Sequence, residues 1–72
     1  MARITNKVRL YRKTLGLRQE DLAELCSVSR QTIIAIENEK YSPSLELAMN
    51  LSRLLGKTVE EVFQQTQDAD KD

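Results

Sequence analysis

The sequence predicts one all-α domain built from five short helices. The 72-residue chain contains only Gly16, Pro43 and Gly56 as helix-breaking residues, and each lies between segments with apolar residues spaced by three and four. No interior segment shows the alternation of apolar and polar residues that is typical of a strand. A chain this short buries only about 60% of its unfolded surface, so we expect a small core, no second domain and a benefit from dimerisation.

The first two helices are predicted over residues 5–15 and 19–26. Gly16 suits the C-terminal cap of the first, and Glu20 and Asp21 in the first turn of the second complement its dipole. The residues available for burial on these two helices are Val8, Tyr11, Leu15, Leu22, Ala23, Leu25 and Cys26.

The third helix is expected to start after Ser29, a good N-cap, and to end near Asn38. Only the three residues SVS separate it from the second helix. Such a tight turn favours two helices that cross steeply, as in a helix-turn-helix over about residues 18–38.

The fourth helix is predicted over residues 44–55, where Ser44 is the N-cap and Gly56 the stop. Thr58 caps a short fifth helix, and Glu61 occupies the capping-box position three residues later. The segment FQQTQ could add a short strand that pairs with the N-terminal MARIT. The inward stripe expected for the fourth helix is Leu45, Ala48, Leu51, Ser52 and Leu55.

The stretch GLRQEDLAELCSVSRQTIIAIENEKYSPSLELA resembles the helix-turn-helix of the XRE family of regulators, which includes the phage repressors and Cro. The resemblance covers about residues 6–63 and is closest to small stand-alone members. It implies a compact lambda-repressor-like DNA-binding domain over residues 1–66. The polar, acidic residues 67–72 are expected to form a frayed tail. The residues that match the family pattern are Gln19, Leu22, Ala23, Val28, Ser29, Ile33, Ile36, Glu37, Asn38, Pro43 and Ser44.

Three positions depart from the family pattern. Arg18 stands where a Thr or Ser usually caps the second helix, and losing that cap costs about 1 kcal/mol. Ser27 occupies the turn position usually held by Gly, where a left-handed backbone costs roughly another 1 kcal/mol. Glu39 replaces the Gly that usually follows Asn38.

The outer face of the third helix carries the candidate base-reading residues Arg30, Gln31, Ile34 and Ala35. An α-helix fits the DNA major groove, where Arg can grip guanine, Gln can pair with adenine and an apolar side chain can contact the thymine methyl group. Ala35 is small enough to allow close approach. The alternative is that Arg30 and Gln31 are simply exposed and that Ile34 is partly buried against the fourth helix.

Phosphate contacts position the recognition helix, and the resemblance implies two of them: one at Gln19 and a second at Asn38, Lys40 and Tyr41, which follow the third helix. Gln19 opens the second helix, where free amides and the dipole favour an anion. We infer Arg18 as an extra cation there, and Tyr41 is either a phosphate donor or a ring that packs in its loop. The full set is Arg18, Gln19, Ser29, Thr32, Asn38, Lys40 and Tyr41.

The resemblance also assigns a structural role to Arg12. In the family, the arginine of the first helix forms a largely buried ion pair with the glutamate of the IEN sequence, which here is Glu37. Removing one partner of a buried pair can cost about 3–5 kcal/mol. Arg12 is therefore expected to stabilise the fold and not to contact DNA freely.

Charge and residue content favour a cytoplasmic nucleic-acid-binding protein over an enzyme. Net charge is zero, but residues 1–18 hold six cations and no acid. Such a local basic surface can steer a polyanion; the alternative is an ordinary solvated helix face. The chain has no His and no second Cys, so no metal site is expected, and no cofactor is expected either. Cys26 aligns with an apolar core position of the family and is interpreted as a buried structural thiol, with redox sensing as the alternative. Without a second domain, no small-molecule effector is expected. No signal peptide or membrane-spanning segment is recognisable.

Surplus apolar residues on the fourth and fifth helices predict a homodimer. The expected interface consists of Leu47, Leu54, Val59 and Phe63, with Met49 nearby. A two-fold dimer would place two recognition helices about 34 Å apart on an inverted-repeat operator. Binding there would block polymerase and repress transcription; the alternative is activation through contact with polymerase. The alternative function is an antitoxin-type module, which would use this same fold mainly to bind and neutralise a toxin protein.

Overall fold

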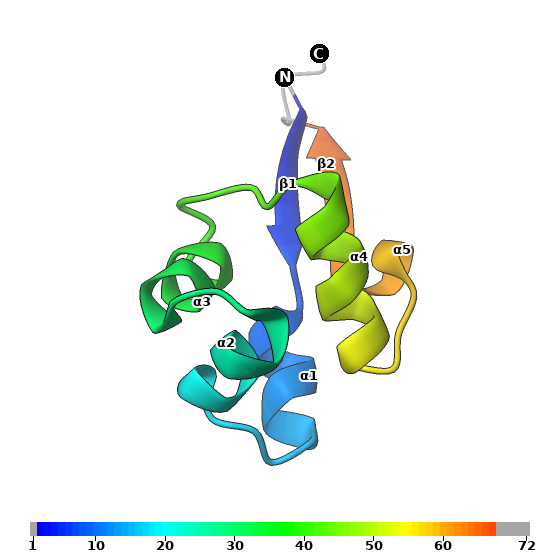
Figure 1. Ribbon diagram of the computed structural model, residues 1–72. Coiled ribbons are helices and arrows are strands. Elements are labelled where there is room, and N and C mark those ends of the chain that lie inside the picture. Colours follow the sequence, from blue (N-terminus) through cyan, green and yellow to red (C-terminus); the bar gives the residue numbers. More distant parts are fainter. Residues whose placement is uncertain (1, 68–72) are drawn as a thin grey trace.

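The computed structural model describes residues 2–67, and it confirms five helices with a short terminal strand pairing (Figure 1). Residues 68–72, most of the predicted acidic tail, lie outside the described residues. No helix in this described part is long and apolar enough to cross a bilayer. In chain order the elements are β1 (Ala2–Asn6), α1 (Val8–Thr14), α2 (Gln19–Cys26), α3 (Arg30–Glu37), α4 (Leu45–Leu54), α5 (Val59–Val62) and β2 (Phe63–Gln67).

The two strands form an antiparallel ribbon that joins the ends of the domain. Its register runs from Ala2 opposite Gln67 to Asn6 opposite Phe63. In Figure 1 the ribbon extends beside α4, away from α1 and α2. Since β1 extends to Asn6, the prediction that the first helix begins at residue 5 is wrong; α1 begins at Val8.

Asn6 connects the ribbon to two helices. Its Oδ1 accepts a hydrogen bond from the backbone N–H of Val8 at 3.1 Å, which satisfies one free amide at the start of α1. Its Nδ2 donates to the backbone carbonyl of Ile36 at 2.8 Å, near the end of α3. The side chain thus links β1, the start of α1 and the last turn of α3.

The core lies where all five helices meet. Its buried residues are Val8, Leu22, Ala23, Ile33, Ile36, Leu51, Leu55 and Val62. Tyr11, Cys26, Val28, Leu47 and Phe63 pack around it and are partly buried.

Three leucines that were available for burial by their spacing lie instead on the surface. Leu15, Leu25 and Leu45 are all exposed, and Leu45 retains 72% of its accessible area. Leu15 and Leu45 lie at helix ends, beyond the turns that contact the core. Helices of eight residues bury only a narrow stripe, which in α2 consists of Leu22 and Ala23, with Cys26 partly buried.

Helices α1 to α4 end in the same way. In each, a residue with positive φ follows the helix, and the next amide bonds back to a carbonyl five residues earlier, as Val28 does to Ala23. This is the Schellman arrangement. The four left-handed residues are Gly16, Ser27, Glu39 and Gly56, with φ of 74°, 57°, 60° and 73°.

We therefore expect Ser27→Gly to raise the free energy of unfolding by up to about 1 kcal/mol, because glycine adopts a left-handed backbone without the Cβ penalty. Urea unfolding measures the change. Gly56→Ser is the reverse control: a Cβ there meets no atom within 4 Å, so any loss comes from the backbone conformation. Equal stability of Ser27→Gly and the wild type would contradict the strain at this turn.

Candidate nucleic-acid interface

Helix α3 is fixed at its start by Ser29. The Ser29 Oγ accepts a hydrogen bond from the backbone N–H of Thr32 at 3.2 Å and lies 3.0 Å from the Thr32 hydroxyl. This is the predicted N-cap, and it starts the helix at Arg30. Ile33 and Ile36 are completely buried and hold one side of the helix against the core.

The other side of α3 faces solvent and carries the candidate base-reading residues. Arg30 and Gln31 are exposed, while Ile34 and Ala35 are half-buried. The structure thus places a guanidinium, an amide and two apolar groups on one outward helix side. Ile34 is thus partly buried, as the alternative for this residue expected.

Glu37, at the last turn of α3, is the acceptor for side chains from α1 and α2. The Arg12 guanidinium donates to both carboxylate oxygens, through Nε at 2.6 Å and Nη2 at 3.2 Å. The Arg12 side chain is 8% exposed and that of Glu37 is completely buried. Arg12 also donates to the carbonyl of Leu17 at 2.9 Å, so the guanidinium spans the turn between α1 and α2.

The electrostatics of Glu37 follow from these contacts. Burial by itself raises the pKa of a carboxyl group, but the hydrogen bonds from Arg12 and Gln19 and the charge of Arg12 outweigh it. The pKa of Glu37 is therefore lowered, and the group is ionised at neutral pH.

The same carboxylate orients the candidate phosphate contact at the start of α2. Gln19 Nε2 donates to Glu37 Oε1 at 3.1 Å. An amide nitrogen carries two hydrogens, so one N–H of Gln19 remains for another acceptor. Gln19 is the first residue of α2, where backbone amides also lack helical partners.

A second amide is oriented at the end of α3, through a residue that the sequence did not mark as part of the site. Arg9 donates to Asn38 Oδ1 at 2.9 Å and to Glu37 Oε1 at 3.4 Å. With its oxygen occupied, Asn38 presents its NH₂ group to other acceptors. Arg9 was recognisable only as one of several N-terminal cations, three residues before Arg12 on the same helix.

Arg18 precedes α2 and pairs with acids in its first turn. A guanidinium has no acceptor, so Arg18 supplies no side-chain cap; instead Asp21 accepts from the Arg18 backbone N–H at 2.8 Å. The Arg18 side chain also donates twice to Asp21, both at 3.1 Å. These hydrogen bonds lower the pKa of Asp21 and offset part of the lost cap.

The remaining predicted phosphate contacts lie around α3. The hydroxyls of Ser29 and Thr32 bond to each other, which occupies part of their capacity. Lys40 and Tyr41 are exposed in the loop between α3 and α4. At the start of that loop, Glu39 pairs with Arg3 of β1 at 2.9 Å.

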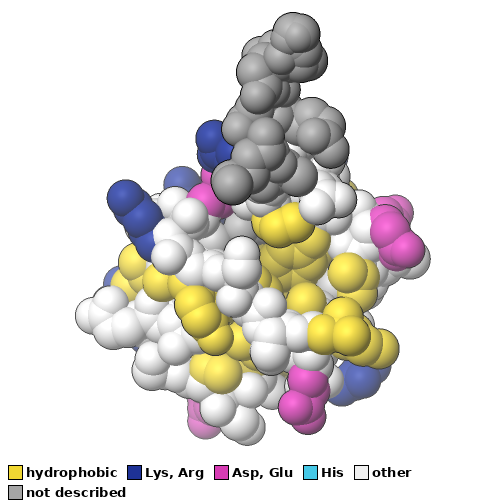
Figure 2. Space-filling view, turned by 90° about the horizontal axis from the view of Figure 1, so that it is seen from above, with side chains coloured by type: hydrophobic (Ala, Val, Ile, Leu, Met, Phe, Trp, Pro, Cys, Tyr) yellow, Lys and Arg dark blue, Asp and Glu magenta, His cyan; other side chains and the backbone are white. Residues whose placement is uncertain are grey.

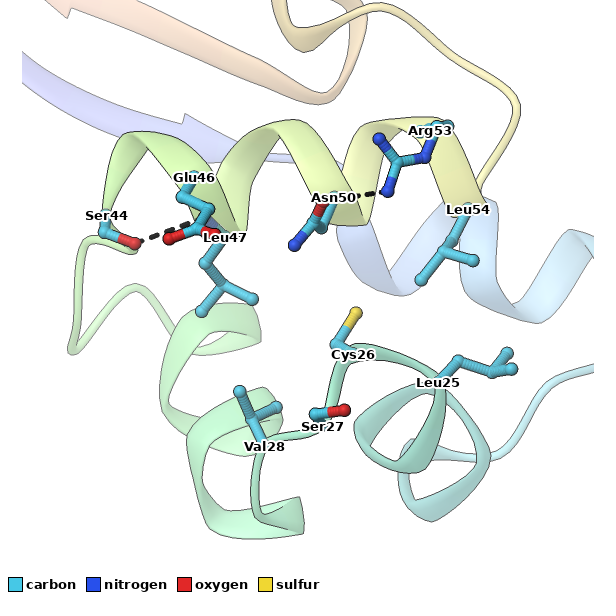
Figure 3. A pocket seen from close by; sticks show the side chains of 10 residues that line it. All are labelled: Leu25, Cys26, Ser27, Val28, Ser44, Glu46, Leu47, Asn50, Arg53 and Leu54. Carbon is cyan, nitrogen blue, oxygen red and sulfur yellow. Dashed lines mark hydrogen bonds between the residues drawn. The ribbon is translucent and has the colours of Figure 1, made fainter.

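The four residues predicted for a dimer interface do not line one surface. Leu47 and Leu54 border a groove between α4 and the α2–α3 turn, in which the Cys26 side chain lies between the two elements (Figure 3). Val59 and Phe63 border a different groove, together with Ile4, Pro43 and Leu45. All four are half-buried. The spacing of apolar residues along the sequence could not show that they border two different grooves, because α4 contributes residues to both.

Comparison with known proteins assigns the family. The helix-turn-helix family model matches residues 8–62, from the start of α1 to the end of α5. The chain belongs to the XRE-type helix-turn-helix family. An uncharacterized HTH-type transcriptional regulator of Methanocaldococcus jannaschii is 52% identical over 58 residues, which cover 81% of this chain and 88% of that protein. One from Methanothermobacter thermautotrophicus is 54% identical over 57 residues, covering 78% and 83%.

Solved structures give the same assignment. The clp gene regulator ClgR of Corynebacterium glutamicum superposes with a TM-score of 0.69 at 29% identity. The match covers 72% of this chain and 55% of ClgR, so this chain spans about half of that protein. The chain is accordingly a DNA-binding transcriptional regulator of the helix-turn-helix class and not an enzyme.

We expect Glu37→Ala to destabilise the domain by about 3–5 kcal/mol, because Arg12 is left buried without its partner. Marginal stability is typical of a domain this small, so much of the variant should be unfolded at moderate temperature. Circular dichroism during heating measures this. Glu24→Ala, which removes an exposed glutamate from α2, is the control; equal melting of both variants would show that the pair does not stabilise the fold.

Acid should weaken the fold through the same group. The pKa of Glu37 is lower in the folded state than in the unfolded chain, so its contribution is present above about pH 4.3 and is lost as pH falls further. Urea unfolding from neutral pH to about pH 3 tests this against the double variant Arg12→Met with Glu37→Met. The double variant should lose less stability on acidification, with the remainder attributable to groups such as Asp21. Identical pH profiles would contradict the assignment.

Proposed function

We propose that this protein recognises a specific double-stranded DNA sequence, binds an inverted-repeat operator as a homodimer and represses transcription. The observation that carries the proposal is the arrangement around α3. An outward side with base-reading chemistry lies between two oriented amide donors, Gln19 at the start of α2 and Asn38 at the end of α3.

The exposed side of α3 carries the side-chain groups that can distinguish one base pair from another in the major groove. Arg30 would donate two hydrogen bonds to guanine O6 and N7, and Gln31 would pair with adenine N6 and N7. Ile34 would contact a thymine methyl group, and Ala35 leaves room for the helix to approach the bases. Each bidentate contact is worth about 1–3 kcal/mol of discrimination against a wrong base.

Phosphate contacts would fix the register of that helix in the groove. Gln19 and Asn38 each retain N–H groups for phosphate oxygens while their other polar bonds are made inside the protein. Lys40 and Tyr41 follow Asn38 along the same backbone. In this proposal Ser29 and Thr32 mainly hold the start of α3, because their hydroxyls are already bonded to each other.

The dimer surface that we propose is the groove that Ile4, Pro43, Leu45, Val59 and Phe63 border. Figure 2 views the molecule from the end where the strands project and shows hydrophobic side chains exposed on this face. A second copy is the occupant that explains it, since a small domain gains core by pairing and an inverted repeat requires two recognition helices. This revises the predicted interface, because Leu47 and Leu54 border the other groove.

In this proposal, repression results from where the dimer binds on the DNA. Two recognition helices about 34 Å apart occupy successive major grooves on one side of the duplex. A dimer bound across a promoter excludes polymerase from that DNA.

Selection of bound fragments from random duplex DNA should yield one enriched inverted repeat. Arg30→Ala and Gln31→Ala should then each weaken binding to it by about 1–3 kcal/mol and relax preference at different base pairs. Both side chains are exposed, so folding should be preserved. Glu24→Ala is the control variant, and its binding to the repeat should stay close to that of the wild type. Equal affinity of the wild type for all duplexes would refute the proposal and favour a protein-neutralising module.

Leu45→Glu should dissociate the dimer, because it places a charge in the proposed interface while the monomer fold keeps its core. Analytical ultracentrifugation should show a monomer, and affinity for the inverted repeat should fall by about tenfold or more as the second half-site is lost. Leu10→Glu is the matched control, since Leu10 is exposed in a different groove. If the two variants sediment alike, this face is not the interface.

A further inference from the structure

An acidic side chain lies among the arginines that face the proposed DNA surface. Glu20 follows Gln19 in α2, and its carboxylate is 3.5 Å from Arg18 Nη1 and 3.7 Å from Arg30 Nε. All three side chains are at least half exposed, with Glu20 at 51%. The carboxylate thus bridges a predicted phosphate contact before α2 and a predicted base-reading residue in α3.

We propose that Glu20 is a specificity-determining residue: it holds Arg30 on the protein as an internal counter-ion and thereby suppresses binding to non-cognate DNA more than binding to the operator. The inference rests on the proposed function. In this scheme Arg30 stays paired with Glu20 and leaves it only when a guanine offers two better acceptor atoms.

The physical argument compares the two kinds of DNA. On non-cognate DNA, affinity comes almost entirely from cations on phosphates, and each added contact strengthens binding through counterion release. A free Arg30 beside the backbone would add such a contact, whereas an Arg30 paired with Glu20 does not. The carboxylate, next to Gln19, also repels the phosphate that Gln19 is expected to bind.

On the operator, Arg30 gains more from leaving Glu20 than it does on non-cognate DNA. Guanine O6 and N7 accept two parallel hydrogen bonds from a guanidinium in a desolvated groove. A single contact at 3.7 Å between exposed groups is weak by comparison, because solvent and salt screen it. Arg30 therefore exchanges Glu20 for guanine at low cost, and Glu20 acts as an element directed against wrong partners.

The geometry indicates that fold stability does not explain this contact. Arg18 makes three hydrogen bonds to Asp21 without Glu20. Exposed ion pairs contribute little to stability. Removing the Glu20 charge therefore leaves α2 and its first turn in place and releases mainly Arg30.

The test is Glu20→Gln, with Glu24→Gln as the matched control because it removes the same charge one turn further along α2. Affinity for a scrambled duplex should rise about tenfold at roughly 0.1 M salt, and its salt slope should steepen by about one phosphate contact. Affinity for the selected operator should rise less, so the ratio of the two affinities falls. Glu24→Gln should change both affinities only slightly.

A measurement without DNA separates this inference from the proposed function. The Nε–Hε resonance of Arg30 should shift in Glu20→Gln and not in Glu24→Gln; an unchanged resonance would overturn the contact. If the wild type prefers its operator and Glu20→Gln alters both affinities equally, the specificity role is refuted while the proposed function stands. If the wild type shows no preference, both fall. Thermal unfolding verifies that each variant is folded.

Discussion

The buried ion pair between Arg12 and Glu37 is the interaction on which the rest of the structure depends. Glu37 is the last residue of α3, and its carboxylate accepts hydrogen bonds from Arg12 and Arg9 of α1 and from Gln19 of α2. One charged group therefore sets the relative positions of the three helices. In a core of aliphatic side chains, such a directional contact supplies orientation that apolar packing alone does not.

The same pair connects stability to the proposed DNA contacts. Gln19 donates one hydrogen to Glu37 directly, and Asn38 is oriented by Arg9, which also reaches Glu37. The two amides that flank the reading side of α3 thus take their orientation from the carboxylate that holds the helices together. A change at Glu37 would disturb fold and DNA contact together, and binding data for its variants require a parallel measurement of folding.

Local signals in the sequence predicted most of the fold, and their limits are physical. Ser29, Ser44 and Thr58 mark helix starts because capping involves residues three apart. Leu25 and Leu45 were misjudged because periodicity defines a direction around a helix but not how wide the buried stripe is. The outward side of α3, with its candidate base-reading residues, could be predicted from the same periodicity. The contacts of Arg9 could not, because its partners are 28 and 29 residues distant in sequence.

Several of the N-terminal cations that the sequence counts toward a basic surface are paired within the protein. Arg3, Arg9 and Arg18 each contact an acid or amide of the protein itself. Under the proposed function, each arginine that binds a phosphate would first have to leave its partner in the protein, and we expect this exchange to lower general affinity for DNA. Ser29 caps the start of α3 and Glu37 fixes its end, so the side chains between them are presented in one orientation. In the proposed function, base-edge contacts rather than charge would therefore select the binding site, because they compensate for the ionic contacts that are given up.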